Sequence, residues 1–391
     1  MFTRVIVIVL DSVGIGATPD AHLYGDSGTN TLVHIAEARG GLLLPVLESL
    51  GLGCIEAIPG VKRVNSPKAC YAKMAELSKG KDTTSGHWEI AGYPVFSPFP
   101  MYPQGFPAEM IDSFVRFTGK KILGNKPASG TEIIQELGAE HMVTGYPIVY
   151  TSGDSVFQIA AHEEIIPPEE LYDICRIARK KVCIGPHAVG RVIARPFVGQ
   201  PGRFTRTAGR HDFSLEPGQT VLDSLKEHHY TVVGVGKIGD IFAHRGLTDS
   251  YPTVSNSDGM NRLHAVLAET SRGLVMVNLV DFDSLYGHRN DAAGYAEALE
   301  EFDRHLALLL PAIRSTDLLI ITADHGCDPT MPGTDHTREY VPLLAFSPAR
   351  ETGLDLGIRT SFADIGATIA EIFHLPGLEY GQSFLPAFKE N

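Results

Sequence analysis

The chain has 391 residues, and its 33 lysines and arginines against 46 aspartates and glutamates give a net charge of −13. This charge disfavours binding to nucleic acids and to acidic membrane surfaces, because both present phosphate groups. The length predicts two or three domains with buried cores. The longest uninterrupted apolar run, residues 5–10, is far shorter than the roughly 20 residues that a membrane-spanning helix needs.

The five cysteines are odd in number and scattered, and no two of them form a CxxC motif. The sequence therefore predicts neither a disulfide framework nor a zinc ribbon, and we expect a protein of the reducing cytoplasm. The apolar run at residues 5–10 resembles a signal peptide only weakly, because it is short and Asp11 interrupts it. We expect this run to form a buried strand instead.

Short β-branched runs alternate with amphipathic segments along most of the chain. Strands are predicted at 5–10, 231–235, 274–280, 318–323 and 341–346, and helices at 259–270, 292–313 and 362–374, the last with Ser361 as N-cap. Continuous apolar strands between helices are typical of a mostly parallel sheet with helices on both faces, which is an α/β fold.

Two irregular stretches interrupt this pattern. Residues 94–107 contain five prolines, which exclude a regular helix or a central strand, and residues 199–219 are also irregular. We therefore expect a smaller α+β cap domain at residues 100–214. It would be inserted into a catalytic core that is formed by residues 1–99 and 215–391.

Acidic side chains directly follow three of the predicted strands, and a histidine follows one of them. In an open parallel sheet, ligands bind just outside the carboxyl ends of the strands, so these side chains should meet at one edge. Two further histidines lie in glycine-containing loops that could fold back to this edge. The candidate metal ligands are Asp11, Asp283, His288, Asp324, His325 and His336.

Any one of these aspartates could instead cap a helix or form a turn, and it is their joint occurrence that indicates a metal site. Carboxylates and imidazoles without a thiolate favour Mn²⁺, Zn²⁺ or Mg²⁺ over metals that prefer soft ligands. Six donors are too many for one ion and suitable for two, as in sites of phosphoryl transfer.

Residues 81–89, KDTTSGHWE, bring several hydroxyl groups to the start of a predicted helix. Asp82 or Thr83 could simply cap this helix. Alternatively, one hydroxyl is a nucleophile, because a two-metal site could activate an alcohol that is weak at neutral pH. The spacing alone does not choose among Thr83, Thr84 and Ser85.

A basic segment stands out in this acidic chain, since residues 191–211 contain five arginines and no acidic residue. Arginine side chains bind phosphate in a bidentate manner, although such a run could also be a solvated basic face. Ser152 and Asp154 offer a donor and an acceptor for sugar hydroxyls, but the same residues are common in turns.

Residues 234–239 match the pattern GxGxxG after a predicted strand. The sequence that follows is too broken for the long helix that carries a pyrophosphate, so we do not expect dinucleotide binding. Lys237 within this segment is a candidate phosphate contact.

Seven segments together resemble the bacterial phosphopentomutases, which belong to the alkaline phosphatase superfamily. They are DSVGIGATPDA (11–21), GKDTTSGHWEIAG (80–92), GNKPASGTEII (124–134), YTSGDSVFQIAAHEE (150–164), VGRVIARPF (189–197), VDFDSLYGHRND (280–291) and ITADHGCDPTMPGTDHTREYVPLL (321–344). The resemblance covers essentially the whole chain. The metal motifs alone would indicate only the superfamily, whereas the motifs within 124–197 indicate the mutase.

The resemblance implies two metal ions, usually manganese, although other divalent ions are compatible with it. Asp11, Asp324 and His325 would bind one ion, and Asp283, His288 and His336 the other. Thr83 would be the phosphorylated nucleophile. The residues placed at the sugar phosphate are Ser152, Asp154, Arg191, Ile193, Arg206 and Lys237.

Cys327 departs locally from the family pattern, in which we expect asparagine at this position. The position is not a metal ligand in that pattern, so we expect the metal site to tolerate the change. A thiol two residues after His325 could nevertheless make the site more sensitive to oxidation.

The implied reaction interconverts α-D-ribose 1-phosphate and D-ribose 5-phosphate, and the 2-deoxyribose pair, in nucleoside and pentose phosphate metabolism. It would pass through a phosphothreonine enzyme and a 1,5-bisphosphate intermediate, and a sugar bisphosphate activator would first phosphorylate Thr83. The expected partners are small pentose phosphates, with no nucleic acid and no membrane. The oligomeric state stays open, and a monomer is compatible with the sequence.

Two kinds of alternative remain at this point. One is a metal-dependent phosphatase or a phosphoglycerate mutase of the same superfamily, and the latter would carry a serine nucleophile. The other is a catalytically inactive protein that binds metal or sugar phosphate. The presence of the hydroxyl group and of all six candidate ligands argues against the inactive protein.

Overall fold

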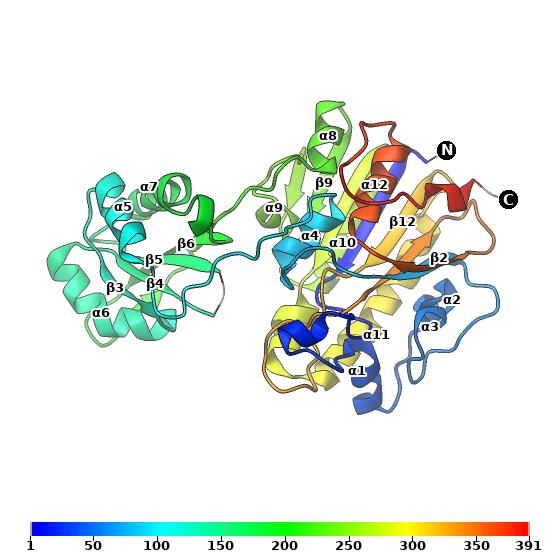
Figure 1. The fold of residues 1–391 in the computed structure, drawn as a ribbon, viewed down its shortest axis with the longest axis horizontal. Coiled ribbons are helices and arrows are strands. Elements are labelled where there is room, and N and C mark those ends of the chain that lie inside the picture. Colours follow the sequence, from blue (N-terminus) through cyan, green and yellow to red (C-terminus); the bar gives the residue numbers. More distant parts are fainter. Residues whose placement is uncertain (1, 154, 390–391) are drawn as a thin grey trace. The chain divides into compact units, whose positions relative to one another are not determined.

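The computed structural model describes residues 2–153 and 155–389, and it divides the chain into two compact units (Figure 1). Unit 1 comprises Met1–Ser97 and Pro217–Asn391, and unit 2 comprises Pro98–Glu216. Both borders fall inside the irregular stretches at residues 94–107 and 199–219.

Unit 1 is built on an eight-stranded sheet with the strand order β10-β9-β11-β1-β12-β13-β2-β14. Neighbouring strands are parallel, except that β13 runs antiparallel to both β12 and β2. The predicted α/β fold with a mostly parallel sheet is therefore confirmed. The strands are β1 (Arg4–Leu10), β2 (Ala69–Met74), β9 (Thr231–Val235), β10 (Asp249–Tyr251), β11 (Gly273–Leu279), β12 (Asp317–Thr322), β13 (Val341–Phe346) and β14 (Asp355–Arg359).

Strand β1, which is blue in Figure 1, lies between β11 and β12, and all seven of its residues are buried. Val7 pairs with Met276 on one side and with Ile320 on the other. Each large apolar side chain buried in this way contributes about 1.5–3 kcal/mol to stability, which explains the continuous apolar sequence of the strand. Because the three strands are parallel, their carboxyl ends open on the same edge of the sheet.

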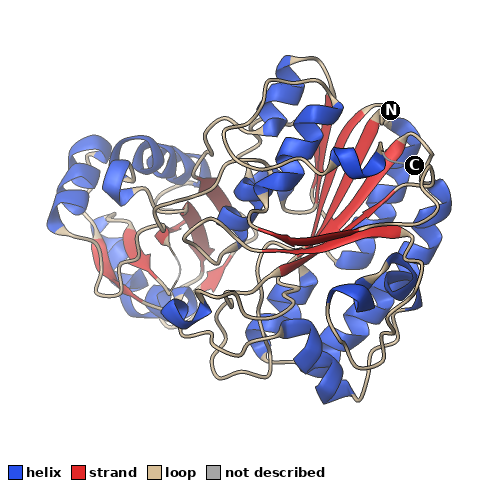
Figure 2. Cartoon of the chain, turned by 45° about the vertical axis from the view of Figure 1, so that its right-hand side comes forward, coloured by secondary structure: helices blue, strands red, loops and turns tan. Residues whose placement is uncertain are grey.

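Helices cover the sheet of unit 1 on both sides (Figure 2). Ser361 is not the N-cap of α12 as predicted, because the helix begins after Phe362 and the hydroxyl of Ser361 donates to the carboxylate of Glu89. The helices are α1 (Thr31–Arg39), α2 (Pro45–Leu50), α3 (Leu52–Ile55), α4 (Thr83–Ile90), α8 (Val221–Glu227), α9 (Ile238–Ile241), α10 (Asn256–Glu269), α11 (Ala292–Leu309) and α12 (Ala363–Ile372).

Unit 2 contains a second sheet with the order β3-β4-β5-β6-β7, and β8 also pairs with β6. Its strands are β3 (Leu123–Pro127), β4 (Ile148–Thr151), β5 (Val156–His162), β6 (Arg191–Val198), β7 (Thr205–Arg206) and β8 (His211–Ser214). Its helices are α5 (Ala108–Thr118), α6 (Gly130–Thr144) and α7 (Pro168–Ile177).

Alternate residues of the strands of unit 2 belong to two separate apolar clusters. In β4, Val149 packs in the cluster that contains Phe114 of α5, whereas Ile148 and Tyr150 pack in the cluster that contains Ile133 of α6. Because successive side chains of a strand point to opposite faces, both faces of this sheet are covered by helices. Across the residues described for both units, no helix is long and apolar enough to cross a membrane.

Candidate metal centre

The first group of candidate ligands lies at the carboxyl ends of β1 and β12. Asp11 follows β1, Asp324 and His325 follow β12, and all three side chains are buried. Nε2 of His325 lies 3.4 Å from Oδ1 of Asp11 and 3.5 Å from Oδ2 of Asp324. One ligand atom from each residue lies within 4.8 Å of the others, so the three residues could hold one metal ion.

The second group follows β11 and includes a histidine from the loop between β12 and β13. Asp283 lies in a π-helical turn, Phe282–Tyr286, and His288 in the next turn, Gly287–Arg289. Nε2 of His288 is 3.2 Å from Oδ2 of Asp283, and Nε2 of His336 is 3.3 Å from Oδ1 of the same carboxylate. The two imidazole Nε2 atoms are 3.1 Å apart.

The two groups adjoin each other in unit 1. The ring centroids of His325 and His336 are 4.0 Å apart. Asp283, His325 and His336 also have ligand atoms within 4.8 Å of one another. The structure thus brings all six candidate ligands together at the edge of the sheet where the strand ends predicted them.

Main-chain carbonyl groups orient one histidine of each group. Nδ1 of His288 lies 2.6 Å from the carbonyl oxygen of Thr334, and Nδ1 of His325 lies 3.0 Å from that of Gly326. A carbonyl oxygen only accepts, so Nδ1 is the donor in each ring. This arrangement leaves Nε2 directed at the carboxylates, as in histidines that bind metal ions.

The charges of the two groups depend strongly on one another. Burial and the neighbouring Asp324 raise the pKa of Asp11. Burial also acts to raise the pKa of Asp283, but hydrogen bonds from His288 and His336 outweigh it and hold this pKa well below its usual range. The hydrogen bond with Asp283 in turn raises the pKa of His288 to about 9.

The donor set fits divalent cations. Oδ1 of Asp283 and Oδ2 of Asp324 are buried, and imidazole nitrogens lie close to both: Nε2 of His336 is 3.3 Å from the first oxygen, and Nδ1 of His87 is 3.0 Å from the second. Several buried carboxylates that lie close together are costly unless cations balance their charge. Oxygen and imidazole ligands are those that Mn²⁺, Zn²⁺ and Mg²⁺ accept.

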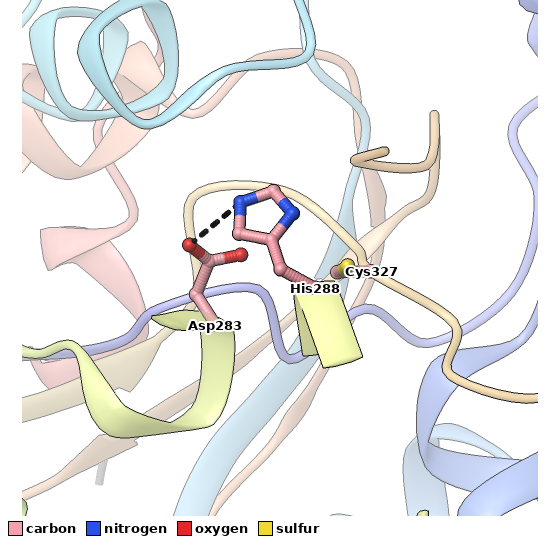
Figure 3. Close-up of side chains that lie close together, drawn as sticks. All are labelled: Asp283, His288 and Cys327. Atoms are coloured by element: carbon pink, nitrogen blue, oxygen red, sulfur yellow. Dashed lines mark ion pairs between the residues drawn. The ribbon is translucent and has the colours of Figure 1, made fainter. Parts of the chain in front are cut away.

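Cys327 lies beside Asp283 and His288 (Figure 3), and ligand atoms of these three residues lie within 4.8 Å of one another. Its thiol lies 3.6 Å from the carbonyl oxygen of Asp335, to which it donates. Burial, together with the charge of Asp283, raises the pKa of the thiol. A buried, protonated thiol is poorly reactive, so the structure disfavours the oxidation sensitivity that the sequence suggested.

Thr83 is the first residue of α4, and Asp82 is the N-cap of this helix. The carboxylate of Asp82 accepts from the amides of Thr84 and Ser85, and the hydroxyl of Ser85 lies 2.8 Å from it in a capping box. The hydroxyl of Thr83 instead lies 3.2 Å from Nε2 of His325 and 3.5 Å from Oδ1 of Asp11. The structure therefore shows both the helix cap and a hydroxyl group at the first ligand group.

A pocket of about 350 Å³ in unit 2 is lined by four of the five predicted sugar-phosphate residues of that unit, Ser152, Arg191, Ile193 and Arg206. Asp154 lies outside the described residues. The residues that line the pocket include Ser129, Gly130, Ser152, Gln158, Arg191, Ile193, Arg195, Arg206 and Arg210. Four arginines in one pocket make it a suitable site for a phosphate group.

Gly130 explains part of the motif at residues 124–134. A Cβ atom at this position would lie 1.8 Å from Nη2 of Arg206 and 2.3 Å from the hydroxyl of Tyr150, so a larger residue would displace the guanidinium. Nε of Arg206 is buried without a hydrogen-bond partner among the residues described. Gly130 also begins α6, whose N-terminal end favours anions.

Lys237 is exposed and occupies the N-cap of α9 in unit 1. This helix has only four residues, which is too short for the pyrophosphate-binding helix that a GxGxxG motif requires. The interpretation of this motif as unrelated to dinucleotide binding therefore agrees with the structure.

Sequence reasoning missed three residues that contact the first ligand group. Ser12 has a positive φ of 71° and its amide donates to Oδ1 of Asp324 at 3.1 Å. Asn278 donates to Oδ2 of Asp11, and His87 lies 3.0 Å from Oδ2 of Asp324. Asn278 was visible as the one polar residue in the apolar run LVMVNLV, whereas nothing in the sequence indicates the backbone conformation of Ser12.

Comparison with known proteins first identifies the superfamily to which the chain belongs. The model of the metalloenzyme superfamily matches residues 3–377, and the chain is a member of this superfamily. The solved structure of the PH0037 protein from Pyrococcus horikoshii has a TM-score of 0.50 at 14% identity, and the match covers 98% of this chain and 99% of that one. At this identity the likeness shows a shared fold alone.

The phosphopentomutase of Caldanaerobacter subterraneus subsp. tengcongensis is 60% identical over 386 residues, which cover 98% of this chain and 98% of that protein. The phosphopentomutase of Carboxydothermus hydrogenoformans is 61% identical over 383 residues, covering 97% of this chain and 98% of that protein. The chain belongs to the phosphopentomutase family, and it is therefore an enzyme of the isomerase class.

Proposed function

We propose that this enzyme interconverts α-D-ribose 1-phosphate and D-ribose 5-phosphate, and the corresponding 2-deoxyribose phosphates. The observation that carries the proposal is the position of the Thr83 hydroxyl, 3.2 Å from Nε2 of His325 and 3.5 Å from Oδ1 of Asp11. The names of the relatives at 60–61% identity support the choice of pentose phosphates as substrates.

In the proposed reaction, phospho-Thr83 transfers its phosphoryl group to the free hydroxyl of a bound sugar monophosphate. A bond forms between phosphorus and the sugar oxygen, the bond between phosphorus and Oγ1 of Thr83 breaks, and the proton of the sugar hydroxyl ends on the released Oγ1. The resulting 1,5-bisphosphate turns around, and its other phosphoryl group returns to Thr83. A sugar bisphosphate supplies the first phosphoryl group.

Two divalent ions, which we expect to be manganese, would neutralise charge on the transferring group when they are bound. Asp11, Asp324 and His325 would hold one ion, and Asp283, His288 and His336 the other. The buried carboxylates and the Nε2 atoms directed at them support this assignment.

Unit 2 would act as the cap domain that binds the phosphate group that is not transferred. Arg191, Arg206 and Ser152 line its pocket and supply charged and neutral donors. We assign Asp154, Ile193 and Lys237 to the sugar phosphate as well, on the resemblance alone. All five cysteines are unpaired, which supports a cytoplasmic location.

Purified enzyme with Mn²⁺, ribose 1-phosphate and a catalytic amount of sugar bisphosphate tests the proposal. Phosphorus NMR should show ribose 5-phosphate forming with little inorganic phosphate, and peptide mass spectrometry should place one phosphoryl group on Thr83. Net release of inorganic phosphate would indicate a phosphatase instead. Phosphorylation of a serine with turnover of phosphoglycerate would indicate the phosphoglycerate mutase alternative.

A further inference from the structure

His87 is a buried histidine one helical turn after Thr83 on α4, and its side chain has no exposed surface. Nδ1 lies 2.8 Å from the carbonyl oxygen of Thr83 and 3.0 Å from Oδ2 of Asp324. Because a carbonyl oxygen only accepts, Nδ1 carries a proton and donates to the main chain of Thr83. The ring thus holds the backbone of the residue whose hydroxyl faces the first ligand group.

The other nitrogen of His87 contacts Asn278, a residue of β11 that is 1% exposed. Nε2 lies 3.3 Å from Nδ2 of Asn278, and this amide nitrogen also donates to Oδ2 of Asp11 at 2.9 Å. Turning the amide around would place its oxygen against a carboxylate oxygen, so the donor orientation is the favourable one. Nε2 of His87 is therefore an acceptor, and a continuous chain of hydrogen bonds links Thr83 to Asp11.

The carbonyl oxygen of Asn278 is buried and has no hydrogen-bond partner among the described residues. An unpaired buried oxygen lowers stability, and a leucine or valine would suit this apolar strand better. Unlike leucine or valine, however, asparagine has an amide nitrogen, and Nδ2 donates hydrogen bonds to both Asp11 and His87. Because Nδ2 of Asn278 donates a hydrogen bond to Oδ2 of Asp11, the other carboxylate oxygen, Oδ1, faces His325 and Thr83.

We propose that His87 and Asn278 are positioning residues for phosphoryl transfer. His87 fixes the main chain of Thr83, and Asn278 turns the carboxylate of Asp11 so that Oδ1 is available to a cation. The part that concerns Thr83 rests on the proposed function, whereas the part that concerns Asp11 depends only on cation binding. Both residues act through their neighbours and do not contact the substrate.

Asn278→Leu tests the second part of the proposal. It removes the donor to Asp11 and also removes the unpaired oxygen, with little change in side-chain size. Electron paramagnetic resonance titration should show one of two Mn²⁺ equivalents bound about 10–100-fold more weakly. The unfolding temperature of the metal-free protein is measured alongside, because the change removes one unpaired oxygen but leaves Oδ2 of Asp11 and Nε2 of His87 without their donor. Unchanged Mn²⁺ affinity, with or without a lower unfolding temperature, would overturn the assignment.

Two variants of His87 test the first part. His87→Asn keeps an N–H group near the position of Nδ1, whereas His87→Gln places its amide near Nε2 and loses the donor to Thr83. His87→Gln should therefore slow the phosphorylation of Thr83 by sugar bisphosphate, followed by mass spectrometry, more than His87→Asn does. Equal rates of phosphorylation in both variants and the unchanged enzyme would remove His87 from the proposal.

His141 offers a matched control in unit 2. It is fully buried, its Nδ1 lies 2.7 Å from the carbonyl oxygen of Tyr146, and its Nε2 accepts from the amide of His162 at 2.9 Å. His141→Asn and His141→Gln should change neither Mn²⁺ affinity nor the phosphorylation of Thr83. The same losses in these variants would show that any buried histidine has this effect, and would refute a positioning role.

The experiments separate this inference from the proposed function. If phosphoryl groups are found on a residue other than Thr83, the proposed function fails, while the Mn²⁺ affinity of Asn278→Leu still decides the role of Asn278. If a His87 variant does not fold, the Asn278→Leu titration alone decides whether the chain of hydrogen bonds positions Asp11.

Discussion

The hydroxyl oxygen of Thr83 lies 3.2 Å from Nε2 of His325, although 242 positions separate the two residues in the sequence. Thr83 begins a helix and His325 follows a strand, so two rigid elements fix this contact. The same capping box that starts the helix also occupies the hydroxyl of Ser85. Of the two residues, Thr83 is therefore the one whose hydroxyl faces the first ligand group.

Thr83→Ala should lower turnover by at least about a thousandfold, because the proposed covalent carrier is removed and no neighbouring group replaces its geometry. The fold and the binding of ribose 5-phosphate should persist, as measured by circular dichroism and calorimetry. Thr84→Ala is the matched control and should keep most of the activity. Substantial turnover in Thr83→Ala, or a phosphoryl group mapped to Thr84, would contradict the assignment.

Removal of the metal ions with a chelator should abolish activity without unfolding the protein, and Mn²⁺ should restore more activity than Ca²⁺. Compact sites with imidazole ligands favour the smaller transition ion over calcium, which prefers more numerous oxygen ligands. His336→Ala should lose about one of two metal equivalents by elemental analysis. His264→Ala, an exposed histidine on α10, should lose none. Full metal content in His336→Ala would refute the ligand assignment.

Replacing both Arg191 and Arg206 with alanine should lower mutase flux by orders of magnitude, because two of the four arginines of the pocket would be lost. The fraction of turnovers that end in hydrolysis should rise, since the intermediate would be held less firmly. The measurement is the ratio of inorganic phosphate to isomerised sugar phosphate. Arg203→Ala is the control, because Arg203 is exposed in the same basic segment and does not line the pocket. A double variant with normal flux and a normal ratio would exclude these arginines as the phosphate contact.

The stability of unit 2 should fall as the pH drops below about 6.5, the ordinary pKa of histidine. Burial lowers the pKa of His141, so the unfolded chain takes up a proton that the folded unit does not. The slope that this residue contributes is at most about 1.4 kcal/mol per pH unit. The pH dependence of this stability can be measured by hydrogen exchange at the amides of α6 in the metal-free protein at several pH values. His141→Gln should flatten the dependence, and an identical slope in this variant would assign the effect to other groups.

The central strands could be predicted from sequence because burial on both faces makes them continuous apolar runs. Once β1, β11 and β12 are identified, the rule for parallel sheets also predicts that Asp11, Asp283 and Asp324 meet at one edge. The antiparallel direction of β13 could not be predicted, since its composition is the same in either direction. β2 and β14 carry mixed sequences, ACYAKM and DLGIR, and show no such run.

The details of the site could not be predicted from the sequence, and the reason is different. The choice between Thr83 and Ser85 depends on which hydroxyl the helix cap uses, and both residues look alike in the sequence. The contribution of His87 and Asn278 depends on contacts between elements that are far apart in the chain. The metal, nucleophile and sugar-phosphate roles taken from the resemblance stay predictions until the variants above are measured.

The position of β1 has a consequence for how the protein is made on the ribosome. Among the described residues, β1 pairs with β11 and β12 alone, and these begin at Gly273 and Asp317, so an apolar segment leaves the ribosome long before its partners exist. Unit 2 is contiguous in sequence, and its sheet and both apolar clusters can form during that interval. Unpaired apolar strands promote association between nascent chains, so β1 needs protection until β11 and β12 have been made. His336 emerges later still, and a truncated chain that ends before it lacks a complete second ligand group.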